Sequence, residues 1–256
     1  MNIYFDNAAT TQLDKRVLDE MIPFMVENYG NPSSIHKHGR EVKTSVENSR
    51  NKIADILGVT PGEIFFTSGG TEADNTFIIN AIYSRKIKTA ITSKIEHHAV
   101  LHTLEDLEKK NVIKILYVNL DSNGHIDYNH LEELISSNPK SLISLMHGNN
   151  EIGNITNIER VAEVCNTNDS IFHSDTVQTI GHFNINLSSN IIHSIVGSAH
   201  KFHGPKGIGF MYINNKIKIP PYIIGGSQER NMRGGTENVS GIIGLSKALE
   251  ITIEEK

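Results

Sequence analysis

The segment Glu63-Ile-Phe-Phe-Thr67-Ser68-Gly69-Gly70-Thr71-Glu72-Ala-Asp74 places an apolar run directly before a pair of glycines and a polar stretch. This order predicts a strand, a tight turn and the start of a helix. Such a turn directs free backbone N–H groups and the positive end of a helix dipole at one point, which suits a phosphate. Glycines are also needed for geometry alone at many such turns, so the segment by itself leaves both interpretations open. It matches neither GxGxxG nor GxxxxGK[ST], which disfavours dinucleotides and nucleoside triphosphates.

Outward from this segment, short apolar runs alternate with stretches of helical periodicity, the pattern of βα units around a largely parallel sheet. Seven strands are predicted, at 63–67, 89–95, 113–120, 141–147, 170–176, 191–200 and 207–213. Most of them are too apolar to alternate, so they are expected to be buried on both faces by helices. Helices are predicted at 71–84, 96–109, 127–136, 157–166 and 239–254. The fold class is therefore α/β.

Two more helices are predicted near the N-terminus from apolar residues at helical spacing, and both stripes are expected to be core. The stripes are Val17, Leu18, Met21, Ile22 and Met25, then Val42, Val46, Ser49, Ile53 and Ile56. The region 219–236 is the only long stretch without periodicity. Long structureless loops in a compact domain are usually functional.

Length and composition narrow the class of protein. A chain of 256 residues with 38% apolar and 21% charged residues can fold as one large domain, or as one domain and a fragment of another. A net charge of −5 with scattered Lys and Arg gives no reason to expect nucleic acid or an anionic membrane as partner. A single cysteine, no charged leader before an apolar run and no membrane-length apolar stretch make the cytoplasm the expected compartment.

Two charged residues follow predicted strands. Asp175 ends one strand, where ligands of open α/β sheets bind, although an Asp there can also cap a helix. Lys201 follows another strand about 25 residues later. A pyridoxal site needs such a pair, a carboxylate for the pyridine nitrogen and an amine for the imine. Lys206, in a Gly-Pro-Lys-Gly turn, is a weaker candidate for the amine because the turn is expected to be mobile.

A set of motifs spread over the whole chain is more specific. They are Phe5-Asp-Asn-Ala-Ala-Thr-Thr11, Gly30-Asn-Pro-Ser-Ser34, Thr67-Ser-Gly-Gly-Thr-Glu-Ala-Asp-Asn75, Glu96-His-His-Ala-Val100, His147-Gly-Asn-Asn-Glu-Ile-Gly153, His173-Ser-Asp-Thr-Val-Gln178, Ser198-Ala-His-Lys201 and Met232-Arg-Gly-Gly-Thr-Glu-Asn-Val239. In order and spacing the chain resembles the cysteine desulfurases, which are fold-type-I pyridoxal 5'-phosphate (PLP) enzymes of the class-V aminotransferase group. The resemblance implies the large PLP-binding domain of that fold.

The resemblance also implies roles for individual residues. Lys201 would be the Schiff-base lysine and Asp175 the partner of the pyridine nitrogen. His97 would stack on the cofactor ring and transfer protons. The remaining cofactor contacts would come from Asn150 and Gln178, and from the phosphate-binding residues Gly70, Thr71, Ser198 and His200, with Thr236 supplied by the other subunit of a homodimer.

The pattern breaks at the cysteine. The family carries its sulfur-accepting cysteine on a mobile loop beyond the large domain, and this chain stops before that loop. Its only cysteine, Cys165, falls on the buried stripe of a predicted helix with Val161 and Ala162, and buried structural cysteines are usually inert. The segment that completes a small C-terminal domain is missing too. Helix 239–254 would then keep an exposed apolar face, either an aggregation liability or a docking site.

The implied domain organisation is an N-terminal segment, 1–15, that packs with the small domain, and a PLP-binding large domain, 16–256. The implied reaction takes L-cysteine to L-alanine and passes the sulfur on as a persulfide, for iron–sulfur cluster or thio-cofactor synthesis, with a sulfur-acceptor or scaffold protein as possible partner. The chain is expected to bind PLP but not to form the persulfide alone.

Two alternatives stay open. The chain can be another class-V enzyme, such as a selenocysteine lyase, an aminotransferase or a β-lyase, or it can be a non-catalytic PLP-binding subunit. A metal site at His97, His98 and His102 is disfavoured because no HExxH pattern accompanies these histidines.

Overall fold

In the part of the chain that the structure describes, the sheet has seven strands, as the sequence predicts. The computed structural model describes residues 3–187, 189 and 191–256, so the first two residues of the predicted N-terminal segment lie outside the described residues. The strands are β1 (Ile64–Thr67), β2 (Thr89–Thr92), β3 (Lys114–Tyr117), β4 (Leu142–Ser144), β5 (Ile171–Asp175), β6 (Ser194–Ser198) and β7 (Gly209–Ile213). They are arranged in the order β1-β7-β6-β5-β4-β2-β3.

Strand direction is parallel throughout except at β7, which runs antiparallel to both of its neighbours, β6 and β1. The prediction of a largely parallel sheet is therefore confirmed. Only residues 199–208 connect β6 to β7. A connection this short cannot carry the crossover that a parallel neighbour needs, so β7 turns back along β6. The carboxyl ends of the other strands meet at one edge of the sheet.

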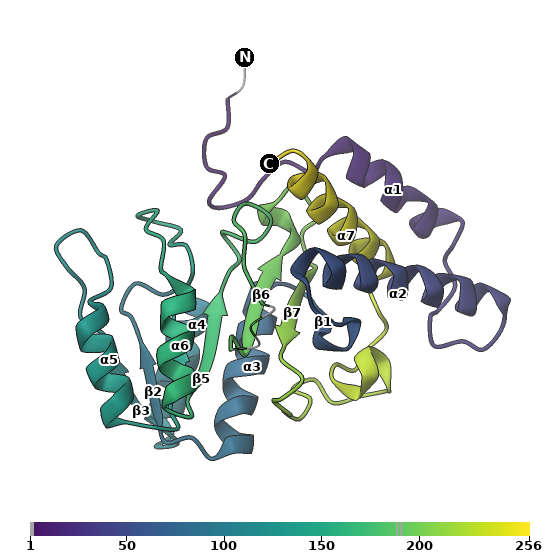
Figure 1. Cartoon of the computed structure of the whole chain (residues 1–256). Helices are drawn as coiled ribbons and strands as arrows, with labels where there is room; N and C mark the ends of the chain where they lie inside the picture. The colour runs from purple at the N-terminus through teal and green to yellow at the C-terminus, as the bar shows by residue number, and fades with distance from the viewer. Residues whose placement is uncertain (1–2, 188, 190) are drawn as a thin grey trace.

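Helices cover both faces of the sheet (Figure 1). They are α1 (Lys15–Val26), α2 (Lys37–Leu57), α3 (Gly70–Arg85), α4 (His98–Lys109), α5 (Tyr128–Ser137), α6 (Ile158–Thr167) and α7 (Val239–Glu254), with short 3-10 turns η1 (Pro61–Glu63), η2 (Ala199–Lys201) and η3 (Gln228–Asn231). Alternate strand residues pack on opposite faces of the sheet. Val196 belongs to the same apolar cluster as Phe77 of α3, whereas its neighbour Ile195 belongs to the same cluster as Leu245 of α7. The strands at the centre of the sheet are buried along their whole length, as predicted.

Only part of the apolar stripe on α1 is buried in the core. Val17 and Met21 are buried, but Leu18, Ile22 and Met25 are 39%, 44% and 59% exposed, so the prediction of a fully buried stripe is wrong. The physical reason is that α1 lies outermost and packs mainly on α7. On α2, Val42, Val46, Ser49 and Ile53 are buried as predicted, whereas Ile56 is half-buried.

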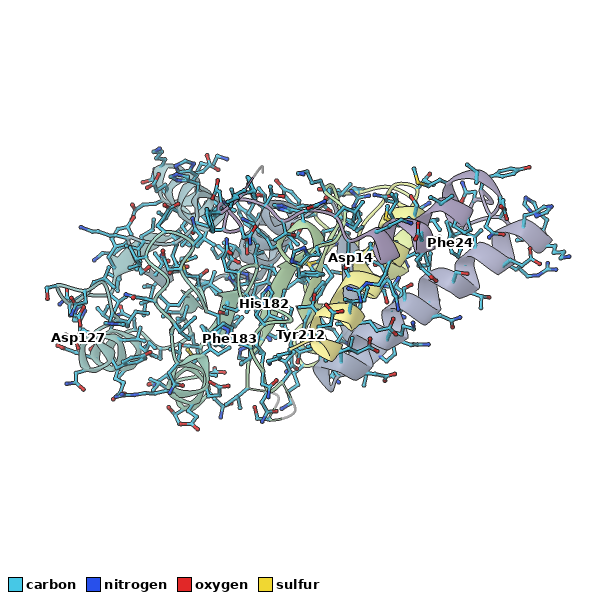
Figure 2. The ribbon with its side chains drawn as sticks, turned by 90° about the horizontal axis from the view of Figure 1, so that it is seen from above. Asp14, Phe24, Asp127, His182, Phe183 and Tyr212 are labelled. Atoms are coloured by element: carbon cyan, nitrogen blue, oxygen red, sulfur yellow. The ribbon has the colours of Figure 1, made fainter. Side chains whose placement is uncertain are left out.

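Helix α7 does not have the exposed apolar face that was expected. Nine of its 16 residues are buried, because α1 and α2 both pack against it. Figure 2, seen from above, shows these three helices side by side at one end of the molecule. The exposed apolar surface in this region belongs to α1.

The long loop at 219–236 is ordered by a buried ion pair. Glu229 on η3 is 3% exposed and holds both terminal guanidinium nitrogens of Arg50, from α2, at 2.8 Å. Its carboxylate also accepts a 2.7 Å hydrogen bond from the backbone N–H of Phe66 on β1. The loop is thereby fixed to α2 and to the sheet.

None of the helices in the described part of the chain is both long enough and apolar enough to cross a membrane.

Candidate active site

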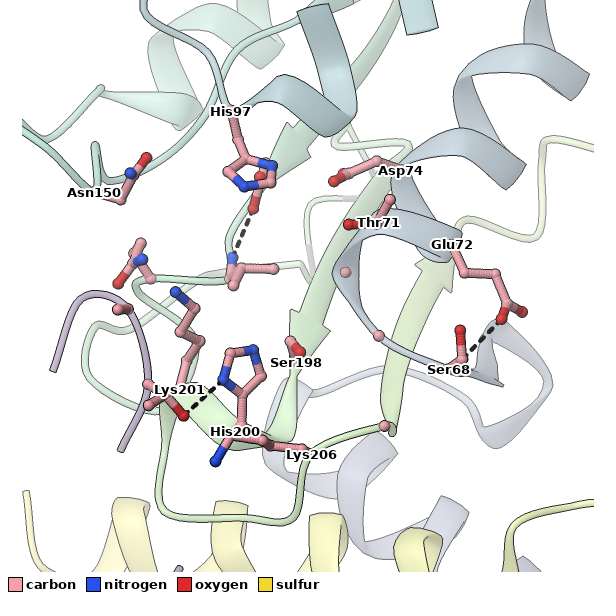
Figure 3. A pocket seen from close by; sticks show the side chains of 18 of the residues that line it. Ser68, Thr71, Glu72, Asp74, His97, Asn150, Ser198, His200, Lys201 and Lys206 are labelled. Atoms are coloured by element: carbon pink, nitrogen blue, oxygen red, sulfur yellow. Dashed lines mark hydrogen bonds between the residues drawn. The ribbon is translucent and has the colours of Figure 1, made fainter. Parts of the chain in front are cut away.

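A cavity of about 630 Å³ lies at the carboxyl edge of the sheet. Loops that follow β1, β2, β4, β5 and β6 all contribute to it, which is where ligands of open α/β sheets bind. Its lining includes nine of the ten predicted site residues, together with Asp74, Met146, Val177 and residues of the N-terminal segment. The nine are Gly70, Thr71, His97, Asn150, Asp175, Gln178, Ser198, His200 and Lys201 (Figure 3).

The start of α3 forms one wall of the cavity. Gly69, its N-cap, has φ 154° and ψ −177°, a conformation that essentially only glycine adopts. A Cβ on Gly70 would stand 2.7 Å from Cγ2 of Val177, so side chains are excluded from this point as well. The hydroxyl of Ser198 would lie 3.7 Å from a Cβ on Gly69. The turn therefore exposes the first N–H groups of α3 beside a hydroxyl, an arrangement that binds phosphate.

Asp175 lies at the base of the cavity, where β5 ends. It is 5% exposed, and its Oδ1 accepts a 2.9 Å hydrogen bond from the backbone N–H of Val177. Burial, with a smaller contribution from the charge of Asp74, raises the pKa of Asp175 to about 7. A cation beside this carboxylate would restore its charge, since an opposite charge favours the ionised form.

Lys201 brings a half-buried amine into the same space. It belongs to η2, directly after β6, and its Nζ donates a hydrogen bond to the carbonyl oxygen of Ala8. Gln178 donates to the same oxygen at 2.9 Å. Burial lowers the pKa of Lys201, against the attraction of Asp175 and Asp6. A larger fraction of this amine is therefore neutral than of an exposed lysine.

His97 and Asn150 form the opposite side. His97 is the N-cap of α4: its Nδ1 accepts from the N–H of Ala99 at 3.1 Å, which fixes the ring and leaves Nε2 available to the cavity. Asn150 follows β4 and donates a 2.6 Å hydrogen bond to Glu151. Its neighbour Asn149 is bonded to the carbonyl of Ile95 at 2.8 Å, so the two loops are held together.

The N-terminal segment closes one side of the cavity. Thr11 donates backbone and hydroxyl hydrogen bonds to the carbonyl of His200, at 2.8 and 2.9 Å. The ring of His200 lies 3.0 Å from the hydroxyl of Thr10. Burial, and then the charges of Lys201 and Lys206, lower the pKa of His200. Lys206 borders the cavity too, from the turn before β7.

Thr236 is the predicted site residue that does not line this cavity. It lines a smaller hollow with Arg233 on the other side of Ser68 and Gly207. Arg233 is paired with Glu72 of α3 at 2.9 Å, and Glu72 also accepts from the N–H of Ser68. Burial by itself would raise the pKa of Glu72, but the hydrogen bonds from Arg233 and Ser68 lower it. The loop of Thr236 is thus tied to the glycine turn at the start of α3.

Two buried carboxyl groups at the site were missed by the sequence reasoning. Asp74, on α3, lines the cavity, and Glu96, before His97, is hydrogen-bonded to Ser93 at 2.6 Å and to the N–H of Met146 at 2.7 Å. Burial raises the pKa of Glu96 to about 8. Both residues lie within sequence motifs whose adjacent residues were assigned site roles. A carboxylate at a predicted buried position was the signal that could have identified them.

Cys165 is completely buried on α6 within the main apolar cluster and does not line the cavity. Burial raises the pKa of its thiol, as expected of an inert structural cysteine. His98 and His102 stack on each other with ring centroids 4.6 Å apart. Among residues 3–187, 189 and 191–256, no three His, Cys, Asp or Glu side chains are grouped as a metal site requires.

Comparisons with known proteins agree with this architecture. The family model described as aminotransferase class-V matches residues 3–256. The chain is 48% identical over 255 residues to the cysteine desulfurase IscS of Dictyoglomus turgidum, covering 99% of this chain but 64% of that protein, so it spans less than two thirds of this relative.

Two solved structures have the same fold over nearly the whole chain. A NifS-like protein superposes with a TM-score of 0.96 at 44% identity, covering 100% of this chain and 70% of the other. SspA, solved in complex with cysteine, superposes with a TM-score of 0.92 at 36% identity, covering 97% and 72%. The chain therefore belongs to the class-V aminotransferase family and, within it, to the cysteine desulfurases.

Proposed function

We propose that this chain binds PLP in the Lys201 cavity and serves the desulfurisation of L-cysteine to L-alanine. The observation that carries the proposal is the meeting of an amine, a buried carboxylate and a helix N-terminus in one cavity, at Lys201, Asp175 and Gly70. The family to which the chain belongs is PLP-dependent. The substrate is taken from the relatives, which are named as cysteine desulfurases, and from SspA, whose structure contains cysteine.

The residues present fit the cofactor. PLP has a phosphate, a basic pyridine nitrogen, a phenolic oxygen and an aldehyde, and the cavity offers a complementary group for each. The glycine turn with Ser198 suits the phosphate, Asp175 the pyridine nitrogen, Gln178 the phenolic oxygen and Lys201 the aldehyde. When bound, PLP would supply an aldehyde that reacts with amines and a ring that withdraws electrons from the substrate Cα.

Lys201 would act as nucleophile and then as base. Because burial lowers its pKa, its Nζ carries a free electron pair in a larger fraction of molecules than an exposed lysine does. A free amine at this position can take a proton from the substrate Cα and return it. For this, the hydrogen bond from Lys201 to the carbonyl of Ala8 has to be exchanged for one to the ligand.

Asp175 would hold the positive charge of a protonated pyridine nitrogen. Its orientation is fixed by the hydrogen bond from Val177, and its buried setting makes the interaction with a cation stronger than it would be in water. His97 would lie against the cofactor ring and move protons at Nε2, since Nδ1 is occupied by the cap of α4.

The thiol that accepts the sulfur is not supplied by the described cavity. The 256 residues contain one cysteine, and Cys165 is buried on α6. We therefore infer that the thiol comes from outside these residues, and that PLP binding and persulfide formation are separable in this chain.

A homodimer with a shared site is part of the proposal. Tyr29, Ile35 and Ile224 are 80%, 90% and 88% exposed. Their two loops are joined by a 3.3 Å hydrogen bond from Gln228 to Ser33, and the second loop carries Thr236. An apolar surface beside Thr236 is what a second copy would have to cover to bring Thr236 to its neighbour's phosphate. Light scattering at two protein concentrations tests this, and a monomer at both would contradict it.

The cofactor proposal is tested by borohydride reduction of the PLP-loaded chain followed by peptide mass spectrometry. A pyridoxyl adduct is expected on Lys201 and not on Lys206, and Lys201→Ala should abolish it. Lys206→Ala is the matched control, because it removes a lysine from the same cavity. If no adduct forms despite added PLP, the result would support the alternative that the chain is a non-catalytic subunit. Consumption of selenocysteine or of an amino donor, but not cysteine, would favour another class-V reaction.

A further inference from the structure

A second polar pair lies behind the cofactor site. Asp74 on α3 and His173 on β5 are 1% and 0% exposed, and His173 Nε2 stands 3.3 Å from Asp74 Oδ1. Neither of these atoms makes a hydrogen bond to any other described residue. A buried polar atom without a partner is costly, so a proton between these two atoms satisfies both at once.

The His173 ring is fixed on its other sides. Its Nδ1 lies 2.9 Å from the hydroxyl of Ser144, and its plane stacks on Phe77 with centroids 5.4 Å apart. His173 comes two residues before Asp175 on β5, so the two side chains are on the same face of the sheet. Asp74 itself lines the cavity; in Figure 3 its carboxyl group is turned toward the space that also contains His97.

We propose that Asp74 and His173 share one proton as a neutral buried pair, and that this pair positions Asp175 and leaves it the charged carboxylate at the base of the cavity. The inference rests on the proposed PLP site, because it assigns the pair a role toward the pyridine nitrogen. Asp74 and His173 are positioning residues that act through Asp175.

The electrostatics of the surroundings support a neutral pair. Burial raises the pKa of Asp74 well above its usual range, and burial lowers the pKa of His173 to about 4 despite the attraction of Asp175. The other titratable groups facing the pair are Glu96 and His97 before α4 and Lys201 on η2. Since two adjacent charged carboxylates would repel, the proton belongs on Asp74, which then donates to His173 Nε2.

Removing Asp74 should therefore disturb Asp175. When Asp74 is removed, Nε2 of His173 loses its hydrogen-bond donor, and water can enter the space left by the carboxyl group. The negative charge of Asp175 can then favour protonation of the His173 ring. A cation there would compete with the pyridine nitrogen for Asp175. An amide at position 74 should prevent this, since its N–H can donate to Nε2 as the carboxylic proton does.

The test uses the full chain and PLP labelled with ¹⁵N at the pyridine nitrogen. The affinity for PLP and the ¹⁵N chemical shift of the bound cofactor are measured for Asp74→Asn and Asp74→Ala. Asp74→Asn is expected to stay within about twofold of wild type in affinity and to keep the protonated-pyridine shift. Asp74→Ala is expected to bind about tenfold more weakly, as for one lost buried hydrogen bond, and to move toward the neutral-pyridine shift.

If Asp74→Asn and Asp74→Ala have the same PLP affinity and the same ¹⁵N shift, the inference is overturned. That result would mean that the charge of Asp74, and not the proton it donates, determines the state of the cofactor. If Asp74→Ala does not fold, the double variant Asp74→Leu/His173→Leu replaces both partners by apolar groups and should keep the protonated shift. A neutral-pyridine shift in that variant also overturns the inference. Failure of wild type to form the Lys201 adduct refutes the proposed function instead, so the two failures are distinguishable.

Discussion

The ion pair between Arg50 and Glu229 should be the interaction on which the 219–236 loop depends most strongly. Both side chains are at most 3% exposed, and the pair is bidentate, with two N–O distances of 2.8 Å. Glu229 also accepts from Phe66, and Arg50 donates to the carbonyl of Ile64 at 2.8 Å while its guanidinium lies over the Phe66 ring. Glu229 has φ 46°, an unfavourable value for a residue with a side chain.

Glu229→Gln keeps the shape of the side chain but leaves the Arg50 charge buried without a full counter-charge. Breaking a buried pair in this way costs about 3–5 kcal/mol. We expect a loss of about 3 kcal/mol in the free energy of unfolding measured in urea, the lower end because Glu47 still contacts Arg50 Nε at 3.2 Å. The exposed pair of Lys110 and Asp106 is the control, and Asp106→Asn should cost under about 1 kcal/mol.

A double-mutant cycle with Arg50→Met and Glu229→Leu separates the interaction energy of the pair from the other effects of each substitution. Because replacing both charges by apolar groups removes the unpaired charge, the double variant should be more stable than the sum of the single losses by about 2 kcal/mol. A Glu229→Gln variant within 1 kcal/mol of wild type, with no coupling in the cycle, would refute the reasoning.

Three further outcomes are expected. Gly70→Ala should weaken PLP binding at least about tenfold, since its Cβ meets Val177 at 2.7 Å, whereas Gly62→Ala, whose Cβ has only Thr60 Oγ1 at 3.7 Å, should not change it; equal effects in a cofactor titration would contradict this. Glu96 has its folded pKa raised to about 8, so the folded state holds a proton that the unfolded state has lost, and stability falls as pH rises. From pH 6.5 to 8 this group should cost the cofactor-free chain about 1.5 kcal/mol, and Glu96→Gln should reduce the slope in urea unfolding; an unchanged slope would mean that Glu96 is ionised throughout. Cys165 should react with a thiol reagent only after unfolding, and Cys165→Ala should leave PLP binding unchanged; fast labelling of the native chain would contradict its burial.

The sequence by itself determined the elements and the identities of most cavity residues. Short apolar runs that do not alternate indicate strands covered on both faces, and all seven were predicted with shifts of a few residues at their ends. Lys201 and Asp175 were identified because each follows such a run, and in a parallel sheet the ends of these runs meet at one edge.

Only the tertiary structure decided which apolar faces are covered and which polar groups meet. Helical spacing marks a face as apolar but does not say what packs on it, so α7 was expected to keep an exposed apolar face and Ile22 was expected to be buried. Both expectations were wrong. The contacts of Asp74 with His173 and of Arg50 with Glu229 join residues 99 and 179 positions apart. Local sequence carries no signal for such pairs, because their energy comes from shared burial that exists only after the chain has folded.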